Sequence, residues 1–131
     1  MEPSYASGQP VLLRKFGLPE DLDYGDIVVI RREDLGRDII KRIAALPGDT
    51  VQITDGLLYV NGEEHSTPAN LSPMEDAGNA SSPITLQPGE YFVLGDNRNH
   101  SIDSRFDEVG IILAPTIAGK VIFPTVRLIS R

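Results

Sequence analysis

Short apolar runs separated by turn-forming residues restrict the fold of this chain more than any other feature of its sequence. The 10 prolines and 12 glycines lie largely between these runs. Runs bounded by Gly, Pro, Asn and Asp are typical of β-strands, and no stretch keeps the 3.6-residue apolar period of a helix. We therefore predict a mainly β fold with little helix. The expected strands are Pro10–Lys15, Asp26–Arg31, Ile39–Leu46, Thr50–Thr54, Leu57–Val60, Tyr91–Leu94 and Gly119–Phe123.

Two dipeptides predict tight hairpin turns. Asp55-Gly56 separates two of the expected strands, and Asn61-Gly62 directly follows the second of them. A type I′ turn requires positive φ at both central residues, which Asp-Gly and Asn-Gly adopt more easily than other pairs. We therefore expect a β-hairpin at the first dipeptide and a further turn at the second.

The composition is that of one globular domain over residues 1–131. Hydrophobic residues make up 40% of the chain and charged residues 24%, both ordinary values for a folded protein. Residues 63–88 differ from the rest because they are polar, rich in Ser, Pro, Asn and Gly, and without strand pattern. We expect them to form a long, variable surface excursion.

Composition and charge also disfavour several functional classes. The net charge of −7 argues against a nucleic-acid partner, which would call for a basic surface. Cysteine is absent, and His65 and His100 have no neighbouring ligand pattern, so we expect no metal site and no cofactor. No apolar run approaches the roughly 20 residues of a membrane-spanning helix, so we expect the 131 residues to be soluble.

Lys41 is the first candidate for chemistry. Lysine occurs only at positions 15, 41 and 120, and Lys41 lies within the apolar strand expected at Ile39–Leu46. Strand alternation places it on the face of Ile39, Ile43 and Ala45, with Arg42 on the opposite face. Burial disfavours the ammonium form, and a neutral lysine can accept a proton from a serine hydroxyl. The alternative is a lysine whose amine reaches solvent at a sheet edge.

Three further segments of the sequence are of interest beside the strand that contains Lys41. Gly25–Ile30 is a Gly-Asp turn that leads into an apolar strand, and Leu46-Pro47-Gly48-Asp49 is a Pro-Gly turn. The polar segment Gly95–Arg105 follows an apolar strand and holds two Asp, two Arg and two Ser. Such a segment suits a polar network beside a site, although taken alone each segment is also compatible with an ordinary strand, turn or solvated loop.

Taken together and in order, these segments resemble the sequence boxes of type I signal peptidases. Gly25–Ile30 is similar to the Gly-Asp-Ile-Val strand of that family, and Lys41-Arg42-Ile43 through Asp49 to the box with the general-base lysine. Gly95–Arg105 resembles the box Gly-Asp-Asn-Arg-x-x-Ser-x-Asp-Ser-Arg, and Gly119-Lys120-Val121 a further family pattern. The resemblance covers nearly the whole chain except residues 63–88.

The resemblance implies a fold of coiled antiparallel β-sheets and a role for each matching residue. Lys41 would be the general base, and Ser101 would orient its amine. Arg42 with Asp96, and Asp103 with Arg105, would form supporting ion pairs. The substrates would be signal peptides of secretory precursors, cleaved after a small-x-small site and bound as an added strand. The residues implied to line the pocket beside the cleaved bond are Met1, Tyr5, Ile39 and Ile40.

The sequence departs from the family at the nucleophile. In the family the nucleophilic serine lies in Ser-Met-x-Pro-[Ser/Thr], and here Met1-Glu2-Pro3-Ser4 matches that motif without its first serine. The resemblance therefore implies a nucleophile directly before Met1 and an inactive 131-residue chain. It also implies a parent anchored by an N-terminal helix at the extracytoplasmic face of a bacterial-type cytoplasmic membrane.

Two other functions fit parts of this pattern. One is a self-cleaving repressor protease of the SOS type, which shares Ser/Lys chemistry. That group would carry a scissile Ala-Gly on a mobile N-terminal loop, whereas Ala77-Gly78 and Ala118-Gly119 lie elsewhere. The other is a peptide-binding module without catalysis, in which the groove is kept and the nucleophile is lost.

Overall fold

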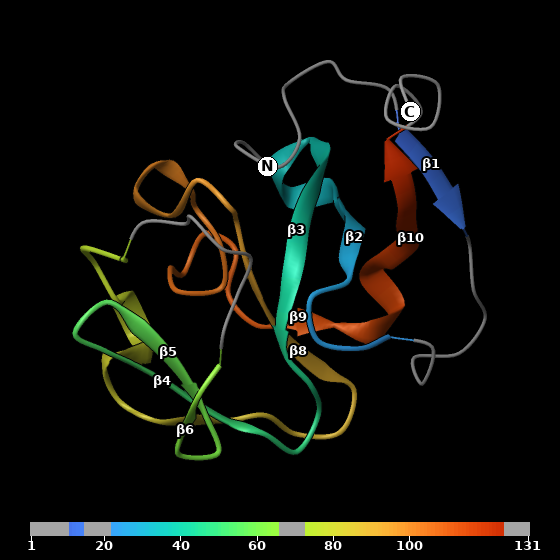
Figure 1. The fold of residues 1–131 in the computed structure, drawn as a ribbon. Helices are drawn as coiled ribbons and strands as arrows, with labels where there is room; N and C mark the ends of the chain where they lie inside the picture. The colour runs from blue at the N-terminus through green and yellow to red at the C-terminus, as the bar shows by residue number, and fades with distance from the viewer. Residues whose placement is uncertain (1–10, 15–21, 66–72, 125–131) are drawn as a thin grey trace.

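Two antiparallel β-sheets that share a core make up the fold (Figure 1). The computed structural model describes residues 11–14, 22–65 and 73–124. Within these residues the helical segments are 3-10 turns of three or four residues, so the predicted mainly β fold with little helix is confirmed. These turns are Glu33–Leu35 (η2), Gly78–Ser81 (η3), Arg98–His100 (η4) and Ala114–Thr116 (η5). No helix in the described ranges is long and apolar enough to span a membrane.

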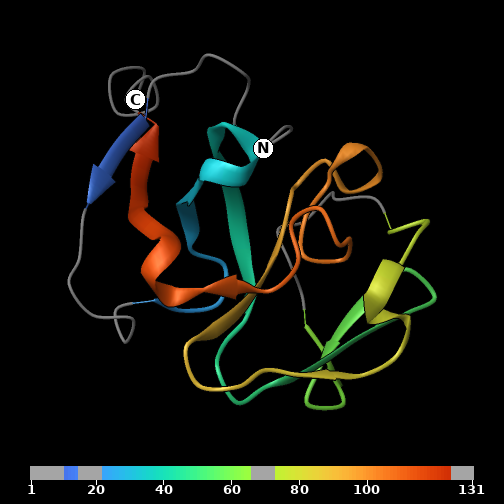
Figure 2. The same ribbon diagram turned by 180° about the vertical axis from the view of Figure 1, so that it is seen from behind.

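The larger sheet has six strands in the order β1-β10-β2-β3-β8-β9, and every neighbouring pair is antiparallel. From behind, β10 lies between β1 at the edge and β2 further in (Figure 2). The four residues at the start of β2 are all buried because both faces of the sheet are covered there. The strands are β1 (Val11–Arg14), β2 (Ile27–Arg32), β3 (Arg37–Ala45), β8 (Glu90–Leu94), β9 (Ile112–Leu113) and β10 (Ile117–Pro124).

The smaller sheet has the order β6-β5-β4-β7 and is built on the two predicted turns. Asp55 and Gly56 have φ values of 52° and 79°, and Asn61 and Gly62 have 55° and 84°, as type I′ geometry requires. Both turn predictions are confirmed. The strands are β4 (Thr50–Thr54), β5 (Leu57–Val60), β6 (Glu63–Glu64) and β7 (Ile84–Thr85).

β3 is followed directly by the first strand of the smaller sheet. The strands that pair with it differ along its length. Its residues 37–42 pair with β2, whereas on the other side β8 pairs only with residues 42–45. The register to β8 shifts between Ile43 and Ala45. As a result, Ala44 and Ala45 both enter the core shared with the smaller sheet, while Ile43 packs in the cluster on the other face. The expected alternation that placed Ala45 beside Lys41 is therefore wrong, because an irregularity of this kind reverses the faces.

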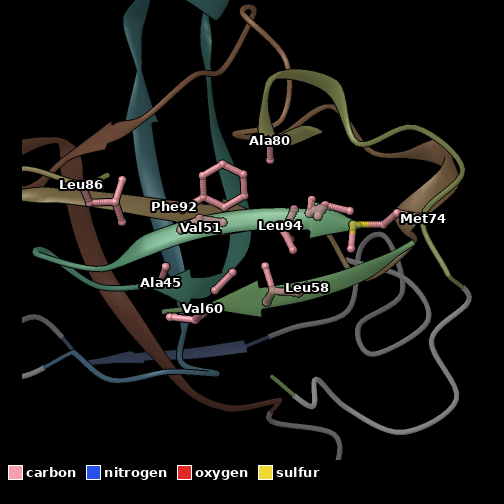
Figure 3. Close-up of a cluster of buried hydrophobic side chains, with 11 residues drawn as sticks. Ala45, Val51, Leu58, Val60, Met74, Ala80, Leu86, Phe92 and Leu94 are labelled. Atoms are coloured by element: carbon pink, nitrogen blue, oxygen red, sulfur yellow. The ribbon is translucent and has the colours of Figure 1, made fainter. Parts of the chain in front are cut away.

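Two large apolar clusters lie on opposite faces of the larger sheet, and a third, smaller cluster contains Ile27, Val29 and Val121. In the cluster between the sheets, Phe92 and Leu94 of β8 pack with Val51, Leu58 and Val60 of the smaller sheet (Figure 3). The cluster on the opposite face contains Leu22, Val28, Ile30, Ile43, Tyr91, Val93, Val109 and Ile112.

The segment 63–88 does not lie only on the surface. Of its described residues, Met74, Ala80 and Leu86 are buried in the cluster between the sheets. β7 also pairs with β4. The expectation of a surface excursion is therefore wrong for these parts. Single apolar residues spaced among Ser, Pro and Asn produce no periodic pattern, and for this reason their burial left no signal in the sequence.

Candidate active site

Lys41 lies on the face of β3 that carries the second apolar cluster. Its strand partner is Val28, which is fully buried in that cluster. The Lys41 side chain is half-buried, and its Nζ donates a hydrogen bond of 3.1 Å to Ser101 Oγ. Burial lowers the pKa of Lys41 below its usual value. The negative charge of Asp103 opposes this shift, and the positive charges of Arg105 and Arg37 add to it.

The segment after β8 brings Ser101 to this amine. It folds back on its own strand, since Ser104 N donates to Val93 O at 3.1 Å and Val93 N donates to Ser104 Oγ at 3.0 Å. Because the chain folds back in this way, Ser101 Oγ lies close to Gly95. A Cβ added to Gly95 would overlap Ser101 Oγ and would lie 2.7 Å from Ser101 Cβ and 3.3 Å from Lys41 Nζ. The contact between lysine and serine therefore requires glycine at position 95.

Asp103 is fully buried and accepts hydrogen bonds at both carboxylate oxygens. Oδ1 accepts from Arg105 Nε at 2.8 Å and from Arg105 N at 3.1 Å. Oδ2 accepts from Gly95 N at 3.0 Å, Ser101 Oγ at 3.1 Å and Arg105 Nη2 at 3.0 Å. The buried Arg105 guanidinium also donates to the carbonyl oxygens of Asp76 and Arg98, at 3.0 and 2.6 Å. Both charges thus have partners, as buried charges need.

Arg42 and Asp96 form a second pair on the opposite face of β3. Arg42 Nε and Nη2 donate to the two carboxylate oxygens of Asp96 at 2.9 and 2.7 Å. Arg42 Nη1 also donates to Gly25 O at 2.9 Å, in the turn before β2. A bidentate pair of this kind fixes direction as well as distance. It holds the end of β8 against both β3 and the Gly25 turn.

The structure brings together most of the site residues expected from the sequence. Lys41 contacts Ser101, and the ion pairs Arg42–Asp96 and Asp103–Arg105 are both present. Their roles in catalysis stay predictions. Met1 and Tyr5 lie outside the described residues. Ile39 and Ile40 are neighbours on β3, and their part in a pocket with Met1 and Tyr5 stays a prediction. Ile39 packs against the second cluster, whereas Ile40 is 37% exposed.

Sequence reasoning missed two features of the site. The steric role of Gly95 depends on the return of the chain to Ser101, six residues later, and no local pattern reports that approach. Arg98 is buried, with its Nη1 3.7 Å from Met74 Sδ and no partner for its Nε among the described residues. Burial lowers its pKa. Its position within a polar segment gave no sign of this burial.

This arrangement suits proton transfer by an amine. A lysine with a lowered pKa is neutral in a larger fraction of molecules at neutral pH and can accept a proton. Neither histidine is placed for that task, since His100 is exposed and the His65 ring packs against Tyr24 at 4.7 Å. Within the described part of the chain, no group of three or more His, Cys, Asp or Glu side chains could hold a metal ion.

Comparison with known proteins places this chain in one family. Residues 1–126 match the sequence model of "Signal peptidase, peptidase S26". A signal peptidase I of Bacillus licheniformis is 36% identical over 95% of this chain and 72% of its own length. Signal peptidase I T of Bacillus subtilis strain 168 is 35% identical, over 95% and 69%. The crystal structure of a signal peptidase I from Enterococcus faecalis V583 covers 77% of this chain and 97% of its own, with a TM-score of 0.62 and 31% identity. The chain belongs to the signal peptidase family, peptidase S26.

Proposed function

We propose that this chain is the catalytic domain of an endopeptidase that removes signal peptides from secretory precursors by a Ser/Lys dyad mechanism. Lys41 is the general base, and the nucleophile is a serine directly before Met1. The observation that carries the proposal is the half-buried Lys41 amine, which has a lowered pKa and is held by Ser101 at 3.1 Å. The family match supports a signal peptidase over a self-cleaving repressor.

The proposed reaction uses Lys41 in both of its stages, formation of an acyl-enzyme and hydrolysis of that acyl-enzyme. The neutral amine takes the proton of the serine hydroxyl, and the serine oxygen attacks the carbonyl carbon of the cleaved bond. Lys41 then gives the proton to the departing amine, which leaves an acyl-enzyme. The same lysine takes a proton from water as the water oxygen attacks the ester, and it returns that proton to the serine oxygen when the acid product leaves. The backbone N–H of the serine contributes to stabilising the oxyanion, an effect worth about 3 kcal/mol in comparable sites.

The open part of β3 supports binding of an extended peptide. On the side away from β2, β8 pairs only with residues 42–45, so residues 37–41 have no partner strand there among the described residues. A peptide added at that edge would lie beside Lys41 and the exposed Ile40. We propose that the small side chains of a small-x-small site are received there. The proposed setting is the extracytoplasmic face of a bacterial-type cytoplasmic membrane, with the parent protein anchored by an N-terminal helix.

The test compares residues 1–131 with an extended chain in which serine precedes Met1 and an apolar segment precedes the serine. A precursor with an Ala-x-Ala site is the substrate. The extended chain should cleave it, with a rate that rises with pH as Lys41 loses its proton. Residues 1–131 alone and extended Lys41→Ala should show no cleavage, whereas extended His65→Ala and His100→Ala should stay near the parent rate. An inactive extended chain, or a histidine variant as inactive as Lys41→Ala, would contradict the proposal.

A further inference from the structure

Residues 73–79 are attached to the core of the smaller sheet. The side chain of Met74 is buried between the sheets, as is that of Ala80 directly after the segment (Figure 3). The backbone N–H of Met74 donates to the carbonyl oxygen of Gly56, in the turn between β4 and β5, at 3.0 Å. The segment is therefore held in a fixed position against the smaller sheet.

The same residues hold Arg105 at its backbone and at its guanidinium. Arg105 Nη1 donates to the carbonyl oxygen of Asp76 at 3.0 Å, and the backbone N–H of Asn79 donates to Arg105 O at 2.7 Å. Among the described residues, Asp76 is the only acceptor of this guanidinium that lies outside the Gly95–Arg105 segment. Because Arg105 is buried, water does not readily replace a lost partner there.

Gly78 makes this close contact possible. Its φ is 56°, in the left-handed region that glycine adopts at little cost, and its N–H donates to Asp76 Oδ1 at 2.8 Å. A Cβ added to Gly78 would overlap the carbonyl oxygen of Arg105 and would lie 3.0 Å from Arg105 C and Cβ. A larger residue at position 78 would therefore push the backbone of Arg105 away from the turn.

Asn99 forms a second attachment between the two segments. Its Nδ2 donates to the carbonyl oxygen of Pro73 at 3.2 Å, and its Oδ1 accepts from the backbone N–H of Glu75 at 2.8 Å. A side-chain amide has both the donor and the acceptor that this pair of backbone groups requires. Asn99 therefore connects the polar segment after β8 to residues 73–75.

We propose that residues 73–79 form a brace that holds Arg105 in place beside Lys41, with Gly78 and Asn99 as its positioning residues. This inference rests on the proposed function, and it extends the residues on which that function depends to the smaller sheet. The brace residues do not lie on β3, where the peptide is proposed to bind. The brace should therefore act on the base and not on the binding of the substrate.

Displacement of Arg105 has a defined effect on Lys41. The positive charge of Arg105 lowers the pKa of Lys41, whereas the negative charge of Asp103 raises it. When the guanidinium moves away from Lys41, its own effect weakens. When it moves away from Asp103, the effect of the carboxylate is less compensated. Both displacements raise the pKa of Lys41, whereas a loss of stability without displacement leaves that pKa unchanged.

An NMR titration of Lys41 in folded residues 1–131 tests the proposal without catalysis. Gly78→Ala should raise the pKa of Lys41 above that of the parent chain. Gly62→Ala is the matched control, because Gly62 also has a positive φ, 84°, and a Cβ added there meets nothing within 4 Å. Both variants carry the strain of alanine in this region, so a general loss of stability should appear in both. An unchanged pKa in Gly78→Ala, or an equal rise in Gly62→Ala, would overturn the proposal.

Asn99→Ala is a second variant, which adds no atom to the interior. Asn99 is exposed, and the change removes its two hydrogen bonds to the brace. The pKa of Lys41 should rise by less than in Gly78→Ala, because the turn at Gly78 still holds Arg105. If Gly78→Ala does not fold, Asn99→Ala decides alone. A Lys41 that titrates in Asn99→Ala as it does in the parent would contradict the proposal.

The kinetic test uses the extended chain. Gly78→Ala should lower kcat at neutral pH on the order of 10–100-fold, since a misplacement of about 1 Å can cost up to about 100-fold, and should shift the pH profile to higher pH. KM should stay within a few-fold of the parent, and Gly62→Ala should keep both constants. A higher KM at unchanged kcat would overturn the proposal. If the extended chain cleaves no precursor, the proposed function fails, and the NMR titration alone decides whether the brace acts on Lys41.

Discussion

An Arg–Asp ion pair lies at each face of β3, and the two pairs differ in the groups that they contact. On one face Arg42 holds Asp96 through two hydrogen bonds, and on the other Arg105 holds Asp103 through two. The Arg42 side chain is 14% exposed and that of Arg105 is 1% exposed. The Arg42 pair links β8 to the turn before β2. The Asp103 pair is connected through a hydroxyl to an amine.

This difference shows how an Arg–Asp pair that stabilises the fold can also belong to a candidate active site. An Arg–Asp pair with satisfied hydrogen bonds fixes the backbone on either face of the strand. Only the Asp103 face adds a lysine that is partly removed from water and a serine that joins the two. The Asp103 face also excludes solvent more completely, so the loss of a partner there should have larger consequences.

Among the variants considered, removal of each carboxylate should change the free energy of unfolding most. Asp103→Ala leaves the Arg105 charge buried without its partner and should lower the free energy of unfolding by about 3–5 kcal/mol. Asp96→Ala leaves Arg42 near solvent and still bonded to Gly25 O, so the loss should be about 1–3 kcal/mol. Urea unfolding of residues 1–131 measures both values. Equal losses would mean that the two faces are buried alike.

A methyl group at position 95 should have a smaller effect on folding and act on the Lys41 face alone. Gly95→Ala places a Cβ against Ser101 and should lower the free energy of unfolding by about 1–3 kcal/mol, the usual range for overpacking. It should also separate Ser101 from Lys41. Ser101→Gly in the same chain removes the colliding atoms and should recover part of the stability. A Gly95→Ala chain as stable as the parent would contradict the close approach of residue 95 to Ser101.

The strands and hairpins were predictable because their patterns are local. β4 and β5 have the bounds expected from the sequence, since Asp55-Gly56 ends one and begins the other. The five other predicted strands are present with shifted ends. β6, β7 and β9 were missed because each has only two residues. Runs of that length have no period to recognise.

The site was predictable in its members and not in its geometry. Lys41 stood out as a lysine in an apolar strand, and family resemblance supplied Ser101, Asp103 and Arg105. The irregularity in β3 that moves Ala45 to the other face has no mark in the sequence. The approach of Gly95 to Ser101 and the burial of Arg98 arise from the return of the Gly95–Arg105 segment onto β8. Such features follow from tertiary packing, which strand patterns do not encode.

The role proposed for Lys41 requires that the fold withdraw its amine from water far enough to make it a base. Burial disfavours the ammonium form in the folded chain and not in the unfolded one, so the folded pKa should lie below the unfolded value of about 10.4. Between the two pKa values the unfolded chain binds more protons. The contribution of Lys41 to stability should therefore rise with pH across that window.

The most direct measurement is an NMR titration of the Lys41 side chain in residues 1–131, folded and in urea. Lys41→Arg identifies the resonance. We expect a folded pKa clearly below the value in urea, with Ser101 and Asp103 signals changing over the same pH range. A Lys41 amine that titrates at the same pH in the folded and unfolded chains would contradict the proposed role of Lys41, because it would remain an ordinary charged lysine at neutral pH.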